Sequence, residues 1–176
     1  MKTIKAYWFE PADGVLQYGD GRKPVVGETH EISGKPAFCK NGLHGSARAL
    51  DALKYAASNN IWIVELSGEM EIGDDKIAAT KRTYIKRVAA EKILFECSRR
   101  FALSVAHLWD MPEVVREFLE TGELTLRAAA GEAAGEAAWA VREAVAWAAA
   151  WAARGDEKNR QQAIFVSYLL ESEGTE

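Results

Sequence analysis

The two halves of this 176-residue chain are built from different amino acids, so one kind of secondary structure does not suit both. Most of the glycines and three of the four prolines lie in residues 1–88, whereas most of the alanines lie in residues 89–176. Glycine and proline mark turns between short strands, and alanine is the best helix former. The sequence therefore predicts an α+β protein, with a β-rich module over 1–88 and a helical module over 89–176 that packs on it.

Charge divides the chain in the same way. Residues 1–88 hold 13 basic and 11 acidic side chains, a net charge of +2, and residues 89–176 hold 9 and 15, a net charge of −6. Opposite net charges favour contact between the two modules. The total of −4 argues against a protein that holds nucleic acid by bulk electrostatic attraction.

Hydropathy and cysteine content indicate a cytoplasmic protein. No apolar run approaches the roughly 18 residues that a membrane span needs. The first residues lack the long apolar region of a secretory signal. The two cysteines, Cys39 and Cys97, are too few for a disulfide framework.

In the first half, alternating apolar residues between turn signals predict a small mixed or antiparallel sheet with one helix. The helix is expected over 47–58, with Ser46 as its N-cap. Both faces of the strand at 61–70 begin apolar, which predicts a central strand. The strand at 80–88 is polar on both faces, which predicts a place near an edge. The other expected strands are 4–9, 15–18 and 27–33.

In the second half, apolar residues recur at helical spacing and predict three to four packed helices. Asp110 and Glu113 form a candidate capping box with Pro112 in the first turn, and Gly122 ends that helix. The other helices are expected over 89–108, 124–154 and 156–171.

The densest group of reactive side chains is the segment 38–46, which holds Cys39, His44 and Ser46 between glycines. One interpretation is a metal site with His30 as a further ligand, although no Cys-x-x-Cys pair is present. Another is a cysteine nucleophile with His44 as its base. The interpretation that we favour is structural: Cys39 is a buried apolar residue without metal, and His44 bonds to backbone at a strand end.

Two further features carry charge where strands are expected. Glu65 lies in the strand at 61–70, either at a solvated end or partly buried with a raised pKa. A basic run either contacts nucleic-acid phosphates or forms a solvated edge that resists aggregation. Its residues are Lys76, Lys81, Arg82, Lys86 and Arg87.

The helix expected over 124–154 presents a candidate partner surface. At 100° per residue, Trp139, Trp147 and Trp151 share a sector with Glu136 and Glu143, opposite a face of alanine and valine. Tryptophan is enriched at binding hot spots, so this sector either binds an external partner or covers the basic module. A homodimer through the alanine face is a third possibility.

Residues 1–88 contain an ordered set of motifs: Cys39-x-x-Gly42-Leu43-His44, Leu53-Lys54-Tyr55, Val64-Glu65-Leu66-x-Gly68 and Asp75-Lys76. This set resembles a family of uncharacterised phage and prophage proteins. Leu43 stands where that family usually has an aromatic residue, and the helical half is similar to tails on other mobile-element proteins. The resemblance implies an accessory protein in the cytoplasm of a bacterial host. We expect it to bind and block a host protein or nucleoprotein complex, as an anti-CRISPR or other anti-defence inhibitor does.

The segment 1–88 also has a glycine-containing strand at Gly42-Leu43-His44, a helix ending in Ala52-x-x-Tyr55 and a strand at 61–66, in that order. In layout only, this order resembles the ADP-ribosyltransferase fold. This resemblance implies an enzyme that uses NAD, in which His44 and Glu65 would act as the catalytic residues. The enzyme interpretation requires these two side chains to face one cleft.

Overall fold

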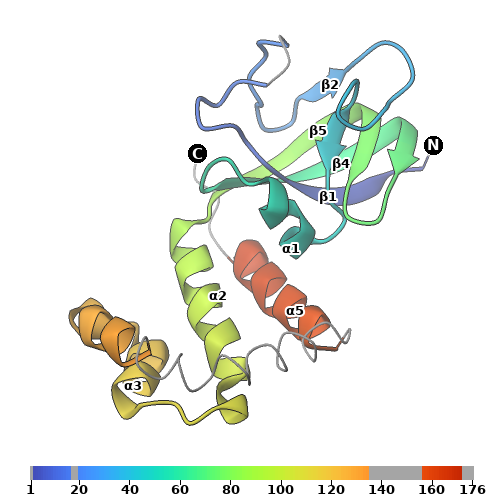
Figure 1. The fold of residues 1–176 in the computed structure, drawn as a ribbon. Helices are drawn as coiled ribbons and strands as arrows, with labels where there is room; N and C mark the ends of the chain where they lie inside the picture. Colours follow the sequence, from blue (N-terminus) through green and yellow to red (C-terminus); the bar gives the residue numbers. More distant parts are fainter. Residues whose placement is uncertain (1, 17–19, 135–155, 172–176) are drawn as a thin grey trace. The chain divides into compact units, whose positions relative to one another are not determined.

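The computed structural model describes residues 2–16, 20–134 and 156–171, and it has the predicted α+β class (Figure 1). The strands are β1 (Ile4–Phe9), β2 (Thr29–Glu31), β3 (Leu43–Gly45), β4 (Asn60–Ile72) and β5 (Ile77–Ala89). The helices are α1 (Ala49–Ala52), α2 (Glu91–Ser104), α3 (Glu113–Thr121) and α5 (Asp156–Glu171). Short 3-10 turns lie at Leu53–Tyr55, Ala106–Leu108 and Leu124–Leu126, and residues 127–134 are helical.

The chain forms two compact units. The first contains Met1–Glu91 together with Phe165–Glu176, and the second contains Lys92–Ile164. The last turns of α5 therefore belong to the unit that holds the sheet, whereas the sequence assigned 156–171 to the helical module.

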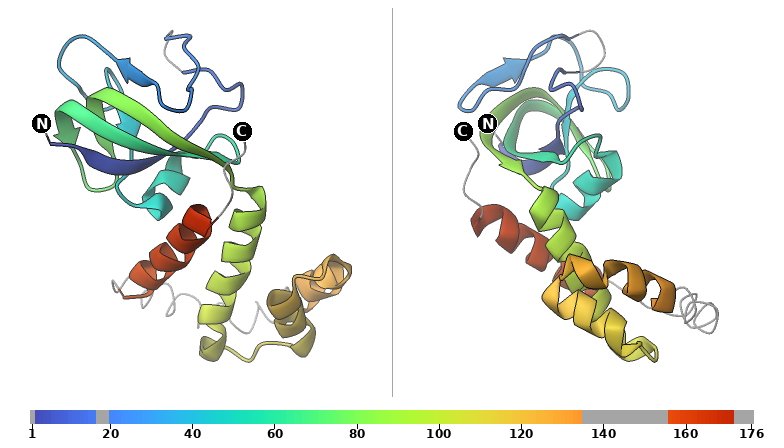
Figure 2. Two further views of the ribbon diagram at one scale, coloured as in Figure 1. Left: turned by 180° about the vertical axis from the view of Figure 1, so that it is seen from behind. Right: turned by 90° about the vertical axis from the view of Figure 1, so that its left-hand side faces the viewer.

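The first unit is built on an antiparallel sheet in the order β1-β4-β5-β2, and β3 also pairs with β5. Just after β3, Ser46 exchanges two backbone hydrogen bonds with Tyr7 of β1, at 2.8 and 2.9 Å. These bonds join β3 to β1, so the strongly curved sheet closes on itself (Figure 2). Gly45 permits the close approach, because a Cβ atom there would lie only 3.2 Å from the Cβ atom of Ala6.

The core of the first unit lies on both faces of β4. Trp62, Val64 and Leu66 pack inside the closed sheet, and Ile61 and Ile63 are buried on the opposite face. The predicted central position of this strand is confirmed, since β4 lies between β1 and β5. Phe165 and Leu169 of α5 add two fully buried side chains to this unit.

The strand expected at 80–88 lies next to the terminal strand β2, so its predicted place near an edge fits, but β5 is not a solvated edge strand. β5 pairs with β4 along one side and with β2 and β3 along the other. The polar residues Arg82 and Tyr84 misled the prediction, because both are buried and bond to each other inside the sheet.

The segment before β4 also differs from its prediction. Ser46 does not cap a helix, because its backbone pairs with Tyr7, and α1 starts only at Ala49. The expected helix over 47–58 is reduced to α1 and one 3-10 turn. Val15 and Leu16 are not in a strand, and the rest of the strand expected over 15–18 lies outside the described residues. Apolar alternation did not predict β3, although the layout resemblance to the ADP-ribosyltransferase fold implied a strand at Gly42-Leu43-His44.

In the second unit, a buried arginine organises the end of α3. Arg99 of α2 donates from Nε to the Leu119 carbonyl at 2.9 Å and from Nη2 to the Glu120 carbonyl at 2.8 Å. As predicted, α3 ends at Gly122, which is left-handed with φ +73°. The predicted capping box is wrong: Pro112 is the N-cap of α3, and no described side chain caps it.

None of the described helices is long and apolar enough to cross a membrane.

Replacing Gly122 by alanine tests this helix end. An added Cβ atom would lie 1.8 Å from Arg99 Nη1, and alanine is disfavoured at φ +73°. We expect Gly122→Ala to lower the free energy of unfolding by about 2 kcal/mol, measured by urea unfolding with circular dichroism. The control is Gly131→Ala in the helical residues 127–134, where no described atom lies within 4 Å of the added methyl. That change should raise stability by up to about 1 kcal/mol. Equal effects of the two substitutions would contradict the proposed role of Gly122.

Candidate ligand-binding site

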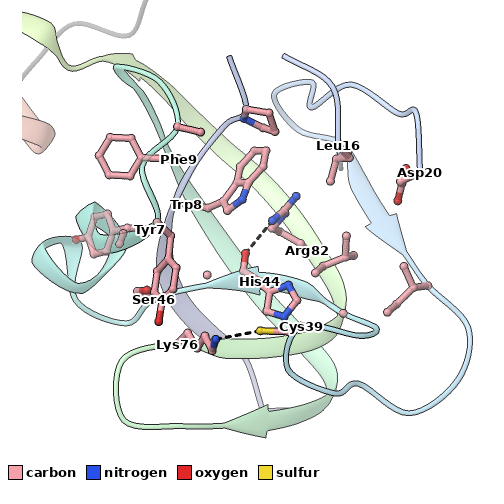
Figure 3. Close-up of a pocket in the computed structure, with 18 of the residues that line it drawn as sticks. Tyr7, Trp8, Phe9, Leu16, Asp20, Cys39, His44, Ser46, Lys76 and Arg82 are labelled. Atoms are coloured by element: carbon pink, nitrogen blue, oxygen red, sulfur yellow. Dashed lines mark hydrogen bonds between the residues drawn. The ribbon is translucent and has the colours of Figure 1, made fainter. Parts of the chain in front are cut away.

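A pocket of about 330 Å³ opens at one end of the closed sheet, entirely within the first unit. One wall comes from β1, whose residues Tyr7, Trp8 and Phe9 line the pocket, with the Trp8 ring on the inner side of the sheet. In Figure 3, Trp8 and Arg82 lie at the centre of the pocket, and His44, Cys39 and Lys76 group together below them. The remaining lining includes apolar side chains, among them Leu16, Ile32 and Leu43.

Arg82 of β5 forms the inner wall of the pocket and is only 1% exposed. Its Nη1 donates to the His44 carbonyl at 2.7 Å, and its Nε and Nη2 donate to the Tyr84 hydroxyl at 3.2 and 2.8 Å. The guanidinium also stacks on the Trp8 ring, with its carbon 3.8 Å from the ring centre. Burial lowers the pKa of Arg82, yet an arginine stays protonated at physiological pH.

The charge of Arg82 has no carboxylate partner within ion-pair distance in the described parts of the chain. The acid that lines the pocket, Asp20, is already bound by Arg22 at 2.6 and 2.7 Å. This arrangement differs from that of Arg87, which pairs with the buried Glu10. The pocket therefore has a buried positive charge that the described residues leave unpaired.

A series of polar contacts leads from Arg82 through Tyr84 and His30 to the exposed Glu28. Because the Tyr84 hydroxyl accepts from Arg82, its own hydrogen is available to Nδ1 of the buried His30, 3.0 Å away. Nε2 of His30 then carries the ring hydrogen and faces the Glu28 carboxylate at 3.7 Å. Burial lowers the pKa of His30, and the charge of Arg22 adds to this effect.

His44 presents an unused acceptor to the pocket. Its ring forms one hydrogen bond with the Gly42 backbone, while Nε2 is buried and has no partner among the described atoms. Burial lowers the pKa of His44, and the nearby charges of Arg82 and Lys76 lower it further. A neutral imidazole that donates to a carbonyl from one nitrogen offers a lone pair on the other.

Cys39 and Lys76 form the rim of the pocket. The predicted burial of Cys39 is wrong, because Cys39 lies in a tight turn between Ala37 and Asn41, with φ +59°, and its side chain is exposed. Lys76 Nζ lies 3.5 Å from the sulfur and 5.2 Å from the centre of the Tyr55 ring. No cluster of three potential metal ligands of the His, Cys, Asp or Glu type occurs in the described residues.

The structure does not bring His44 and Glu65 together. His44 lies on β3 and lines the pocket, whereas Glu65 is exposed, is absent from the described lining, and alternates with the buried Val64 and Leu66 along β4. The catalytic pair expected for an NAD-using enzyme is therefore not assembled at this pocket. The milder interpretation of Glu65, an exposed carboxylate, is the one that fits.

The other predicted site residues do not form one surface. Arg82 is in the core, so its expected contact with nucleic acid is wrong. Arg87 is paired with Glu10, and Lys81 with Glu31 at 3.1 Å. Lys86 is half-buried on β5. The predicted partner surface lies outside the described residues; it comprises Glu136, Trp139, Glu143, Trp147 and Trp151.

The histidines make the stability of the fold depend on pH. The folded pKa values of His30 and His44 lie below the ordinary 6.5, so the unfolded chain binds protons more readily. The free energy of unfolding is therefore highest above pH 6.5 and falls as the pH drops below it. We expect the urea midpoint to fall between about pH 7 and about pH 5.5, before the carboxylates titrate.

The control for this measurement is His107→Gln, which changes an exposed histidine of the second unit and should leave the pH dependence intact. A midpoint that stays constant over this pH range would contradict the neutral, buried state of His30 and His44.

Comparison with known proteins gives one similarity. Residues 13–96 match a domain of unknown function, DUF7666. The matched segment contains β2 to β5 and most of the pocket lining, whereas Tyr7, Trp8 and Phe9 precede it. No curated protein and no solved structure gives a match. The chain is thus similar to DUF7666 over the part that holds Cys39, His44 and Arg82.

Proposed function

We propose that the first unit is a small-molecule-binding domain and that its ligand occupies the pocket beside Arg82. The observation that carries this proposal is the pair of polar groups at the inner wall, Arg82 and His44, whose binding capacity the described chain does not use. Buried polar groups without partners are costly unless something satisfies them. A mostly apolar pocket with a few convergent polar groups is the usual form of a ligand site.

The walls of the pocket are suited to binding because they are held by backbone hydrogen bonds. Tyr7 is fixed by its two bonds to Ser46, and Trp8 is paired with Trp62 across β1 and β4. A preorganised site loses little conformational entropy when a ligand binds. Binding is favoured over NAD-dependent transfer because His44 and Glu65 do not share this pocket.

The role expected from the resemblance to phage proteins, blocking a host complex, stays a prediction. Its tryptophan surface at Trp139, Trp147 and Trp151 lies outside the described residues. A ligand pocket in the first unit is compatible with such a role and does not depend on it.

Filling the pocket tests the proposal. Ala57 is exposed and lines the pocket, so Ala57→Trp should obstruct it, whereas the exposed neighbour Ala56 does not line it in the described structure. The probes are four ring compounds: adenosine, adenosine 5′-monophosphate, 4-hydroxybenzyl alcohol and 4-hydroxybenzoate. We expect at least one of them to shift the NMR signals of the Trp8 indole and the backbone of 43–46 in the wild type and in Ala56→Trp. In Ala57→Trp these shifts should fall at least about tenfold at equal concentration, because a tryptophan excludes the ligand volume.

The absence of shifts with all four compounds at millimolar concentration would contradict the proposal. Equal shifts in Ala57→Trp and Ala56→Trp would also contradict it, since binding would then lie elsewhere.

A further inference from the structure

The proposed function does not specify the chemical class of the ligand. The charges around the pocket restrict that class. Resting on that proposal, we infer that the ligand is an organic anion, a carboxylate or a phosphate ester, that also carries a hydroxyl or amino group. The anion would be drawn to Arg82 and Lys76, and the hydrogen-bond donor would meet Nε2 of His44.

The first argument is the unpaired charge of Arg82. A guanidinium has five N–H bonds, and those of Arg82 make three hydrogen bonds, to the His44 carbonyl and the Tyr84 hydroxyl. The two remaining N–H bonds have no partner among the described residues. A buried cation without a counter-ion is strongly unfavourable, and an anion in the adjoining pocket would offset that cost.

The second argument is the charge of the pocket rim. Lys40 and Lys76 line the pocket, and the described structure gives neither of them a carboxylate partner. The neighbouring acid, Asp75, instead accepts from Lys54 and Tyr55 at 3.2 and 3.0 Å. The lining thus contains three cations and one acid, Asp20, which is neutralised by Arg22. Such a field concentrates anions in the pocket.

The third argument is the unsatisfied acceptor of His44. With the other ring nitrogen bonded to Gly42, Nε2 of neutral His44 accepts a hydrogen bond and cannot donate one. An anionic oxygen would not satisfy it, but a hydroxyl or amino group would. The pocket therefore recognises two features of one ligand, a negative charge and a hydrogen-bond donor.

The aromatic lining favours a ligand that contains a ring. The Trp8 ring of β1 lies at the centre of the pocket (Figure 3), and Tyr55 lines the pocket from the turn after α1. Flat rings stack favourably on such side chains. This is the reason for using ring compounds as probes.

The experiment compares two matched pairs in which only the anion differs. The pairs are adenosine 5′-monophosphate against adenosine, and 4-hydroxybenzoate against 4-hydroxybenzyl alcohol. We expect the anionic member of at least one pair to bind about tenfold tighter, because a charge-assisted hydrogen bond replaces a neutral one. The pair with the larger ratio distinguishes a phosphate ligand from a carboxylate ligand.

Variants assign the effect to the pocket. Lys76→Gln should weaken the anionic probe about threefold and leave its neutral partner unchanged. The control Lys23→Gln, at an exposed lysine that is not in the described lining, should change neither. In the wild type, binding should also move the ¹⁵N signal of His44 Nε2 upfield, since that nitrogen gains a donor.

The outcomes separate this inference from the proposed function. If neutral and anionic members bind the pocket equally, the anion assignment is overturned while the binding function stands. If the Nε2 signal of His44 does not move while an anionic probe binds, the donor assignment is overturned. If no probe perturbs the pocket, both the inference and the proposed function fail.

Discussion

The burial of the Arg82 guanidinium is the interaction on which the first unit depends. Its Nη1 holds the carbonyl of His44 on β3, its Nε and Nη2 hold the Tyr84 hydroxyl on β5, and its face stacks on Trp8 of β1. One side chain therefore ties three strands together at the end where the sheet opens into the pocket. The Ser46–Tyr7 bridge closes the same ring of strands through the backbone.

Such a charge is costly to bury, and the half-buried Arg87 of the same unit has a different environment. Arg87 is matched by Glu10, whose pKa is lowered by its hydrogen bonds to Arg87 and Trp62 even though burial acts in the opposite direction. Arg82 has neutral partners only, among the described residues. Replacing a buried charge by an apolar side chain of similar volume is often neutral or stabilising, so stability alone does not explain why an arginine stands there. A pocket that attracts an anion does explain it.

Much of the fold was predictable because local patterns decide it. β1 at 4–9, the central β4, the left-handed helix end at Gly122 and α5 at 156–171 all follow from apolar periodicity or glycine chemistry. Periodicity missed β3 because its three residues are held by pairing with β5 rather than by their own pattern. β5 was expected to be solvated because a polar residue in a strand normally faces water, whereas Arg82 and Tyr84 are buried and bond to each other.

The site was only partly predictable for the same reason. His44 and Cys39 could be selected from the density of reactive side chains in 38–46, and both line the pocket. Arg82 was taken for a surface cation, because the sequence does not reveal that it stacks on Trp8. The two residues are 74 positions apart in the sequence. The register that pairs Trp8 with Trp62, and Leu66 with Arg82, brings these residues to one side of the sheet. Pairing across strands is a tertiary property that periodicity does not encode.

The most direct test is an NMR measurement of the Arg82 guanidinium in the wild-type protein. If the side chain is buried and donates to His44 and Tyr84, its Nε and Nη hydrogens should give separate signals that exchange slowly with water at neutral pH. These signals should be assignable by their loss in Arg82→Lys. A single averaged Nη signal that exchanges as fast as that of a free arginine would contradict the account.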